Sequence, residues 1–308
     1  MPASDGAAEW IGLVTVNGRT LRVAVRGLIS TPDRRGAPEA AGAPPPLLLC
    51  NGIGGSLEQL APFADALGRG REVIRFDLPG IGGSPPPAVP YHLTTLPGLL
   101  RGLLDRLGHP KADVLGISWG GGLAQQLALA HPRLVRRLVL VATGTGTLMV
   151  PAHPRVLRHM LTPQRHRDPG YAAAVAAQIY GGSLRTDPDR ARELLHAGRQ
   201  LGPRRGYYYQ LLAGVGWTSL PLLPLLRPPT LLLAGDDDPV IPLANARLMH
   251  RLIPHSELHV YHGGHLELIA QPGRLAPVVE AFLDARPAPS TAPDRSQPGR
   301  SQPGRTES

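Results

Sequence analysis

A chain of 308 residues, of which 42% are hydrophobic, is long enough for one large domain that carries an inserted subdomain. No apolar run approaches the roughly 20 residues that a membrane-spanning helix needs, and the polar, partly acidic start of the chain does not resemble a secretory signal. The single cysteine, Cys50, excludes a disulfide within the chain and fits a reducing compartment. We therefore expect a cytoplasmic protein without a transmembrane segment.

The net charge of +9 is concentrated in one part of the chain. Residues 151–229 carry eleven arginines against four acidic residues. A basic surface of this kind can bind nucleic acid, an anionic surface or an acidic protein. Because the arginines are dispersed and no nucleic-acid-binding motif accompanies them, we expect a solvated helical surface and no nucleic-acid partner.

The first half of the chain alternates between β-rich and helix-forming runs. Strands are predicted at residues 10–16, 19–27, 47–50, 72–77, 112–115 and 138–142, and helices at residues 56–67, 94–107 and 123–130. Asn17-Gly18 is typical of a two-residue hairpin turn, and Ser56 is a plausible cap of the first helix. Pro97 falls in the first turn of the second helix, where proline is tolerated. Strands that alternate with helices predict a mostly parallel, doubly wound α/β sheet.

The second half interrupts this alternation with a helical, arginine-rich segment and then resumes it. Strands are again predicted at 230–234 and 258–261, followed by a helix at 272–283. We predict a core in two parts, residues 1–148 and 227–285, with a helical cap at residues 149–226 inserted between them. Residues 286–308 are predicted to form a disordered tail. Residues 30–46, rich in Pro, Ala and Gly, predict a surface loop or insertion.

The stretch Gly116-Ile117-Ser118-Trp119-Gly120 stands between a predicted strand and a predicted helix. Strand, Gly-x-Ser-x-Gly, helix is the pattern of a nucleophile elbow, in which a strained turn exposes a serine at the edge of an α/β-hydrolase sheet. A glycine-rich turn that contains a serine by chance is the alternative, and the flanking elements favour the elbow. The sequence therefore predicts an α/β-hydrolase fold with Ser118 as its nucleophile.

A serine hydroxyl needs a base, and that base must be oriented by a carboxylate. In this fold the acid follows the serine in the chain, after a strand, and the histidine comes last. Gly235-Asp236-Asp237-Asp238-Pro239 directly follows the strand at 230–234. Asp238 is the preferred acid because it stands third after the glycine and precedes a hydrophobic pair and a proline, and Asp237 is the alternative. Three adjacent carboxylates repel one another, so one or two must face water or a donor.

The chain contains twelve histidines, so position decides among them. His265 lies in Gly263-Gly264-His265, just after the last predicted strand, where a flexible loop can return it to the edge of the sheet. His262 is its competitor. We expect His265 to be the base.

A tetrahedral intermediate needs preorganised backbone donors. One is expected from the N–H of Trp119, the residue after the nucleophile, and the other from Ile53 in Asn51-Gly52-Ile53-Gly54. That loop lacks the Lys-Ser/Thr of a phosphate-binding loop. Since no Cys/His cluster has metal-ligand spacing either, we expect neither a cofactor nor a metal.

With these motifs the chain resembles the intracellular medium-chain-length polyhydroxyalkanoate depolymerases of the α/β-hydrolase superfamily, over about residues 47–283. The elbow and acid motifs are typical of the whole superfamily. Two strings in the cap indicate the depolymerases: Ile179-Tyr180-Gly181-Gly182, and the run at residues 206–219 that includes Tyr207-Tyr208-Tyr209-Gln210 and Trp217.

The resemblance implies a serine ester hydrolase whose catalytic triad maps to Ser118, Asp238 and His265. It implies cleavage of a polyester of 3-hydroxyalkanoic acids, with action at polyester granules. Trp217, Tyr207 and Tyr208 are expected to line an apolar cap that suits aliphatic side chains. The alternatives are another reaction on the same scaffold, such as a carboxylesterase, an acyltransferase or a C–C bond hydrolase, and a non-catalytic protein that coats granules.

Overall fold

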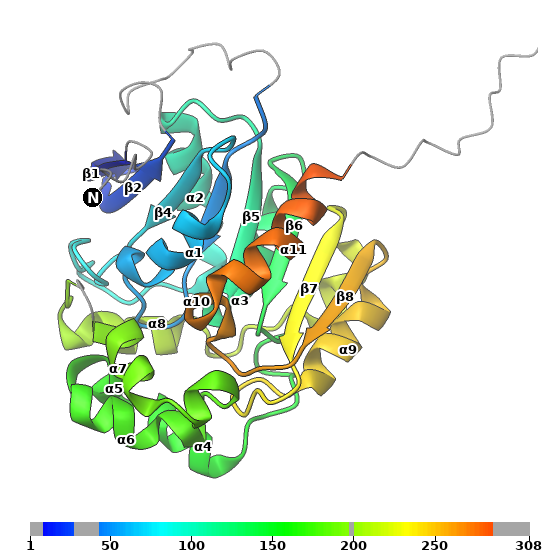
Figure 1. Cartoon of the computed structure of the whole chain (residues 1–308). Coiled ribbons are helices and arrows are strands. Elements are labelled where there is room, and N and C mark those ends of the chain that lie inside the picture. Colours follow the sequence, from blue (N-terminus) through cyan, green and yellow to red (C-terminus); the bar gives the residue numbers. More distant parts are fainter. Residues whose placement is uncertain (1–8, 28–42, 197–199, 286–308) are drawn as a thin grey trace, which may run out of the picture.

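An eight-stranded sheet forms the centre of the molecule (Figure 1). The computed structural model describes residues 9–27, 43–196 and 200–285. The strands, in chain order, are β1 (Glu9–Val16), β2 (Arg19–Arg26), β3 (Leu47–Cys50), β4 (Val73–Phe76), β5 (Ala112–Ile117), β6 (Val135–Val141), β7 (Thr230–Gly235) and β8 (Ser256–Tyr261). They lie side by side in the order β1-β2-β4-β3-β5-β6-β7-β8. The pairs from β4 to β8 are parallel, whereas β1 with β2 and β2 with β4 are antiparallel.

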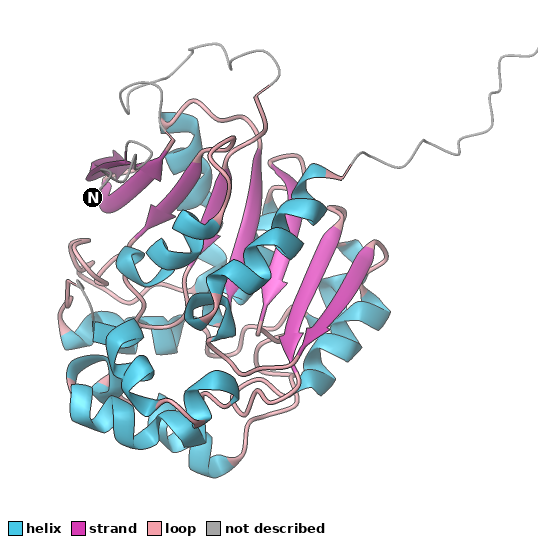
Figure 2. Ribbon diagram, viewed as in Figure 1, coloured by secondary structure: helices cyan, strands magenta, loops and turns pink. Residues whose placement is uncertain are grey.

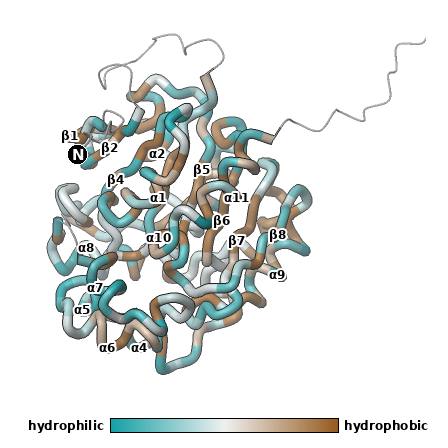
Figure 3. Tube along the Cα trace, viewed as in Figure 1, coloured by the Kyte–Doolittle hydropathy of each residue, from teal (hydrophilic) through white to brown (hydrophobic). Residues whose placement is uncertain are grey.

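Helices cover both faces of the sheet (Figure 2). They are α1 (Ala61–Ala66), α2 (Leu96–Arg106), α3 (Trp119–Ala130), α9 (Leu243–Leu252), α10 (Glu267–Ala270) and α11 (Pro272–Asp284). Successive side chains of a strand point to opposite faces, and β3 accordingly sends Leu48 to one hydrophobic core and Leu49 to the other. The first core packs against α2, α3 and α9, and the second against α1 and α11. The central strands β3, β4, β5 and β7 are therefore buried on both faces, and their hydropathy is mainly apolar (Figure 3).

The mostly parallel sheet with helices on both faces confirms the predicted fold class. β6 begins before the predicted strand at 138–142 because two arginines weaken its apolar signal in the sequence. Arg136 is nevertheless accommodated there, since its guanidinium pairs with the buried carboxylate of Asp113 at 2.6 Å.

The predicted helix at 56–67 and its cap are corrected by the structure. The segment is a 3-10 turn, η1 (Leu57–Leu60), followed by the short helix α1. Ser56 does not cap it: its hydroxyl lies 2.6 Å from the carboxylate of Glu58, to which it donates, and accepts no hydrogen bond from the backbone of the turn. Pro62 stands in the first turn of α1, where a proline favours the start of a new helix.

A group of helices stands between β6 and β7 in the chain and lies beyond the carboxyl ends of the strands (Figure 1). Its members are α4 (Pro154–Met160), α5 (Gln164–Arg167), α6 (Pro169–Ile179), η3 (Gly182–Arg185), α7 (Pro188–His196), α8 (Arg204–Ala213) and η4 (Leu220–Leu225). We refer to this group as the cap. The domain boundaries predicted at 148 and 226 stay predictions. Most of the predicted insertion at 30–46 and all of the predicted tail at 286–308 lie outside the described residues.

The register of the parallel strands brings distant loops to one edge. Cys50 of β3 pairs with Gly116 of β5, and Gly235 of β7 pairs with Tyr261 of β8. The loops after β3, β5, β7 and β8 therefore leave the sheet at its carboxyl edge, beneath the cap, where ligands bind in sheets of this kind.

Gly120 is packed tightly at this edge, whereas Gly98 is a helical glycine with open space around it. A Cβ at Gly120 of α3 would lie 2.2 Å from the backbone oxygen of Cys50, whereas a Cβ at Gly98 of α2 would meet nothing within 4 Å. We expect Gly98→Ala to raise the free energy of unfolding by about 0.5–1 kcal/mol because alanine restricts the unfolded chain. Gly120→Ala should lower it by about 1–3 kcal/mol because the backbone must shift. Urea unfolding measures the free energy of unfolding of both variants. Equal effects of the two substitutions would contradict the close packing of Gly120 against β3.

Candidate active site

Ser118 stands on the sharp turn between β5 and α3. Its φ of 55° and ψ of −122° place a residue with a side chain in a region that mainly glycine occupies. The turn is held from both sides: the Ser118 N–H donates to the oxygen of Val141 at 2.9 Å, and the hydroxyl of Thr143 donates to the oxygen of Ser118 at 2.7 Å. Gly116 allows the turn to close, because a Cβ there would lie 2.3 Å from the oxygen of Gly120. The side chain of Ser118 is thereby fixed at the carboxyl edge.

His265 and Asp238 complete a chain of hydrogen bonds with Ser118. Oγ of Ser118 lies 2.9 Å from Nε2 of His265, and Nδ1 of His265 lies 2.8 Å from Oδ2 of Asp238. The other carboxylate oxygen of Asp238 accepts hydrogen bonds from the N–H groups of Val240 and Ile241 at 2.8 and 2.9 Å. His265 and Asp238 are only 2% and 8% exposed. This geometry lets the imidazole take a proton from the serine while the carboxylate fixes its orientation.

The competing candidates lie elsewhere. Asp237 pairs with Arg185 at 2.6 Å, and this hydrogen-bonded guanidinium holds the pKa of Asp237 below its ordinary value. Asp236 lies 3.1 Å from His262, whose side chain is 88% exposed. The three adjacent aspartates therefore have separate partners, which limits the repulsion between them. Neither Asp237 nor His262 makes a hydrogen bond to Ser118.

The loop of His265 is held by the cap. The N–H of His265 donates to the oxygen of Tyr180 at 2.7 Å. The backbone of Gly182 passes so close that a Cβ there would lie 2.1 Å from the nitrogen of Gly264. Glu267, which the sequence did not single out, accepts hydrogen bonds from the N–H of Gly264 and from Ser183. Gly181 and Gly182, the glycine pair of the first cap motif, thus pack against the loop of His265.

Two backbone N–H groups are available beside Ser118. In the loop after β3, the N–H groups of Gly52 and Gly54 donate to Asn51 and Gln210, while the N–H of Ile53 has no acceptor among the described residues. Trp119 is the first residue of α3, and the N–H groups of a first helical turn lack intrahelical acceptors. Ile53 and Trp119 therefore present donors of the kind that an oxyanion needs.

Gln210 of the cap links the loop of Ile53 to the indole of Trp119, and sequence reasoning missed it. Its side-chain oxygen accepts from the N–H of Gly54 at 2.7 Å, and its backbone oxygen accepts from Nε1 of Trp119 at 3.1 Å. The residue is 1% exposed. The only available signal was its place in the second cap string, next to three tyrosines.

An apolar cavity of about 240 Å³ opens beside Ser118. Trp217 lies along its wall, with Nε1 held by the side chain of Gln126 at 2.8 Å. The other lining residues include Leu93, Trp119, Thr143, Met149, Leu157, Leu211 and Ile241. Tyr207 is instead buried against Arg165, and Tyr208 is 43% exposed and lines neither cavity beside Ser118. The expected contact with substrate is therefore kept for Trp217 and withdrawn for Tyr207 and Tyr208.

Within the described ranges, no group of three or more His, Cys, Asp or Glu side chains is placed to hold a metal ion. Cys50 is buried, and its burial raises the pKa of its thiol, which keeps it neutral. Every helix in the part of the chain that the structure describes is too short or too polar to cross a bilayer.

Comparison with known proteins agrees with this architecture. Residues 45–272 match the family model of the alpha/beta hydrolase fold. The chain is 46% identical over 256 residues to a poly(3-hydroxyalkanoate) depolymerase of Ectopseudomonas oleovorans, which covers 83% of this chain and 88% of the relative. It is 29% identical over 243 residues to 3-oxoadipate enol-lactonase 2 of Acinetobacter baylyi, covering 78% and 88% of the two chains.

A solved structure, that of a hydrolase from Pseudomonas aeruginosa, superposes with a TM-score of 0.70 at 26% identity and covers 92% of this chain and 100% of its own. The strand order, the serine turn between β5 and α3 and these matches lead to one assignment. The chain belongs to the α/β-hydrolase fold family.

Proposed function

We propose that this protein is a serine hydrolase that cleaves the ester bonds of a medium-chain-length poly(3-hydroxyalkanoate). The proposal rests on the hydrogen-bonded chain Ser118–His265–Asp238, which lies at the edge of an apolar cavity of about 240 Å³. The relative from Ectopseudomonas oleovorans, at 46% identity, supports the substrate class. A protein with this substrate would act at the surface of polyester granules.

In the first step the Ser118 hydroxyl attacks the ester carbonyl carbon. His265 takes the proton of the hydroxyl, and Asp238 stabilises the imidazolium that forms. The N–H groups of Ile53 and Trp119 donate to the oxyanion, and one such donor is worth about 2.7–4 kcal/mol of barrier height. His265 then protonates the leaving alcohol, and an acyl group remains on Ser118.

In the second step a water molecule attacks the acyl group. His265 takes a proton from the water and returns it to Ser118, so the acid is released and the hydroxyl is restored. The aliphatic side chain of the acyl unit would occupy the cavity along Trp217 and Leu211, whose lining is mostly apolar.

The alternatives differ in substrate or in chemistry. A carboxylesterase with the same residues would hydrolyse a soluble p-nitrophenyl octanoate but not a dispersed medium-chain polyester. A non-catalytic granule-binding protein would bind the polyester and fail to react with a fluorophosphonate probe.

Ser118→Ala should abolish release of hydroxyalkanoic acids from the polymer, because no other group occupies the position of Oγ. Product analysis after incubation with polyesters of short and of medium side-chain length measures this, with the unfolding midpoint as a control for folding. We expect the wild-type protein to release acid mainly from the medium-chain polymer. Undiminished release by a folded Ser118→Ala protein would refute the mechanism.

Asp238→Ala should lower kcat by roughly 10³- to 10⁴-fold, because the imidazole loses the group that orients it. Asp237→Ala is the matched control: it removes a neighbouring carboxylate that pairs with Arg185 near the surface, and it should change kcat only a few-fold. Hydrolysis of p-nitrophenyl octanoate measures both variants. If the larger loss occurred in Asp237→Ala, the acid would have to be reassigned.

A further inference from the structure

Arg165 of α5 carries a positive charge that is almost completely buried. It is 2% exposed. Its Nη1 donates to the oxygens of His159 and Thr162 at 3.2 and 3.4 Å and to the hydroxyl of Tyr207 at 2.9 Å. All of these acceptors are neutral. A buried charge is costly unless it is compensated.

Two other arginines with little exposure pair with carboxylates, whereas Arg26 and Arg137, 5% and 7% exposed, donate to backbone oxygens. Arg71 pairs with Asp113 at 2.6 Å, and the guanidinium of Arg75, 3% exposed, pairs with Glu9. Among the described residues, no carboxylate forms an ion pair with Arg165. The charge of Arg165 therefore lacks a counter-ion within the part of the chain that the structure describes.

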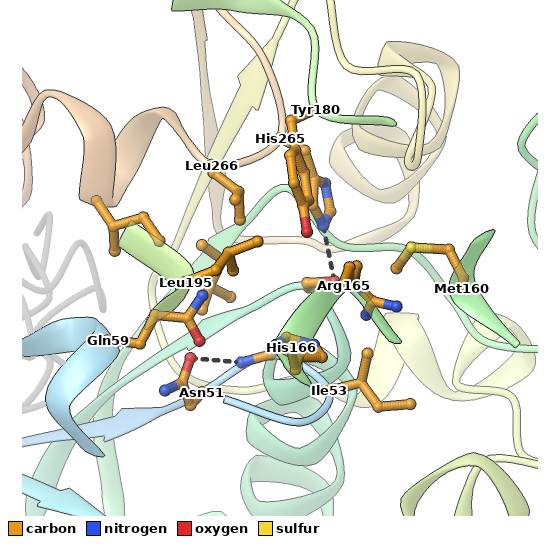
Figure 4. A pocket seen from close by; sticks show the side chains of 14 residues that line it. Asn51, Ile53, Gln59, Met160, Arg165, His166, Tyr180, Leu195, His265 and Leu266 are labelled. Atoms are coloured by element: carbon orange, nitrogen blue, oxygen red, sulfur yellow. Dashed lines mark hydrogen bonds between the residues drawn. The ribbon is translucent and has the colours of Figure 1, made fainter. Parts of the chain in front are cut away.

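This guanidinium borders a second cavity beside Ser118. The cavity measures about 30 Å³ and is also lined by Asn51, Ile53 and His265 (Figure 4). In the close-up, Arg165 lies between His265 and Ile53. A buried water occupies about 10–15 Å³ on this scale, so the cavity accommodates a group of two or three heavy atoms, such as a carboxylate, and the alkyl chain of the same unit must lie outside it.

The two cavities meet at Ser118 and differ in character. Both are bordered by Ser118, Ile53 and Met160. The large apolar one extends past Trp119, whereas the small one with Arg165 contains His265. Because His265 must give its proton to the leaving oxygen, the alcohol part of the ester is expected on the side of Arg165.

We propose that Arg165 binds the carboxylate of the leaving unit, so that the enzyme recognises the free carboxyl end of a hydroxyacid oligomer and removes its terminal unit. In a polyester of 3-hydroxyacids, a single methylene separates the carboxyl carbon from the carbon that bears the ester oxygen. At the chain end that carboxyl group is charged, and within the chain it is a neutral ester. A guanidinium pairs strongly with a carboxylate, so Arg165 favours the terminal ester bond.

The chemistry is that of the proposed function, on which this inference rests. The bond between the carbonyl carbon and the ester oxygen of the terminal unit breaks, and a bond from Oγ of Ser118 to that carbon forms. The serine proton passes through His265 to the leaving oxygen, which departs as a 3-hydroxyalkanoate with its carboxylate on Arg165. Water then hydrolyses the acyl group from Ser118.

The test compares two substrates that differ in one charge: the dimer of 3-hydroxyoctanoate with a free carboxylate, and its methyl ester. We expect the wild-type protein to prefer the free acid by roughly 10- to 100-fold in kcat/KM, the effect of one charged hydrogen-bonded pair. Arg165→Gln should lose this preference while it still hydrolyses the methyl ester. Arg155→Gln, which removes an exposed cap arginine, should keep the preference.

The outcomes separate the inference from the proposed function. If the wild-type protein hydrolyses both dimers equally well, the role of Arg165 is overturned and the proposed function stands. If it hydrolyses neither dimer nor the polymer, the proposed function fails. A preference that disappears at high salt would also overturn the inference, because screening acts mainly on exposed charges such as those of the cap surface.

A purely structural role for Arg165 would reduce hydrolysis of both dimers in parallel. If Arg165→Gln does not fold, the wild-type protein still decides the question with a trimer labelled at its carboxyl end. Release of labelled monomer as the first product supports the inference, and initial release of unlabelled monomer overturns it.

Discussion

The close approach of three backbone segments at the carboxyl edge is the constraint on which the site depends. Between β5 and α3 the chain turns so sharply that Gly116 and Gly120 are almost in contact, and Gly120 in turn lies against the end of β3. This packing forces Ser118 into a positive φ and at the same time brings the loop of Ile53 beside it. The nucleophile candidate and one candidate oxyanion donor are thus positioned by the same backbone contacts, independently of side-chain contacts.

The cap contributes to the geometry of the site as well as covering it. Gln210 of α8 holds both the loop after β3 and the indole of Trp119, and Tyr180 holds the backbone of His265. The serine, the histidine and the loop after β3 lie on segments of the core that are far apart in sequence, and the cap contacts all three regions. A movement of the cap would therefore alter the spacing of these groups as well as the access of substrate.

Charge is distributed differently on the two sides of Ser118. The cavity along Trp217 is mostly apolar, which suits an aliphatic acyl chain. The smaller cavity contains a buried guanidinium. The basic composition of the cap region therefore has two components: arginines on an exposed surface, such as Arg190 and Arg192, and one buried arginine beside the site.

The sequence by itself determined the fold class, since the alternation of apolar strands with helices and the pattern around Ser118 are local and periodic signals. It also narrowed the acid to two aspartates and the base to two histidines. Only the tertiary structure showed that Asp238 and His265 are hydrogen-bonded in a chain with Ser118. It also showed that Asp237 pairs with Arg185 and that His262 pairs with Asp236. Neighbours in sequence cannot be separated by pattern alone, because the turn of each loop decides which carboxylate or imidazole faces inward. The contacts of Gln210, Glu267 and Arg165 were also decided by the tertiary structure alone. These side chains contact other segments of the chain, and the residues next to them in sequence do not predict such contacts.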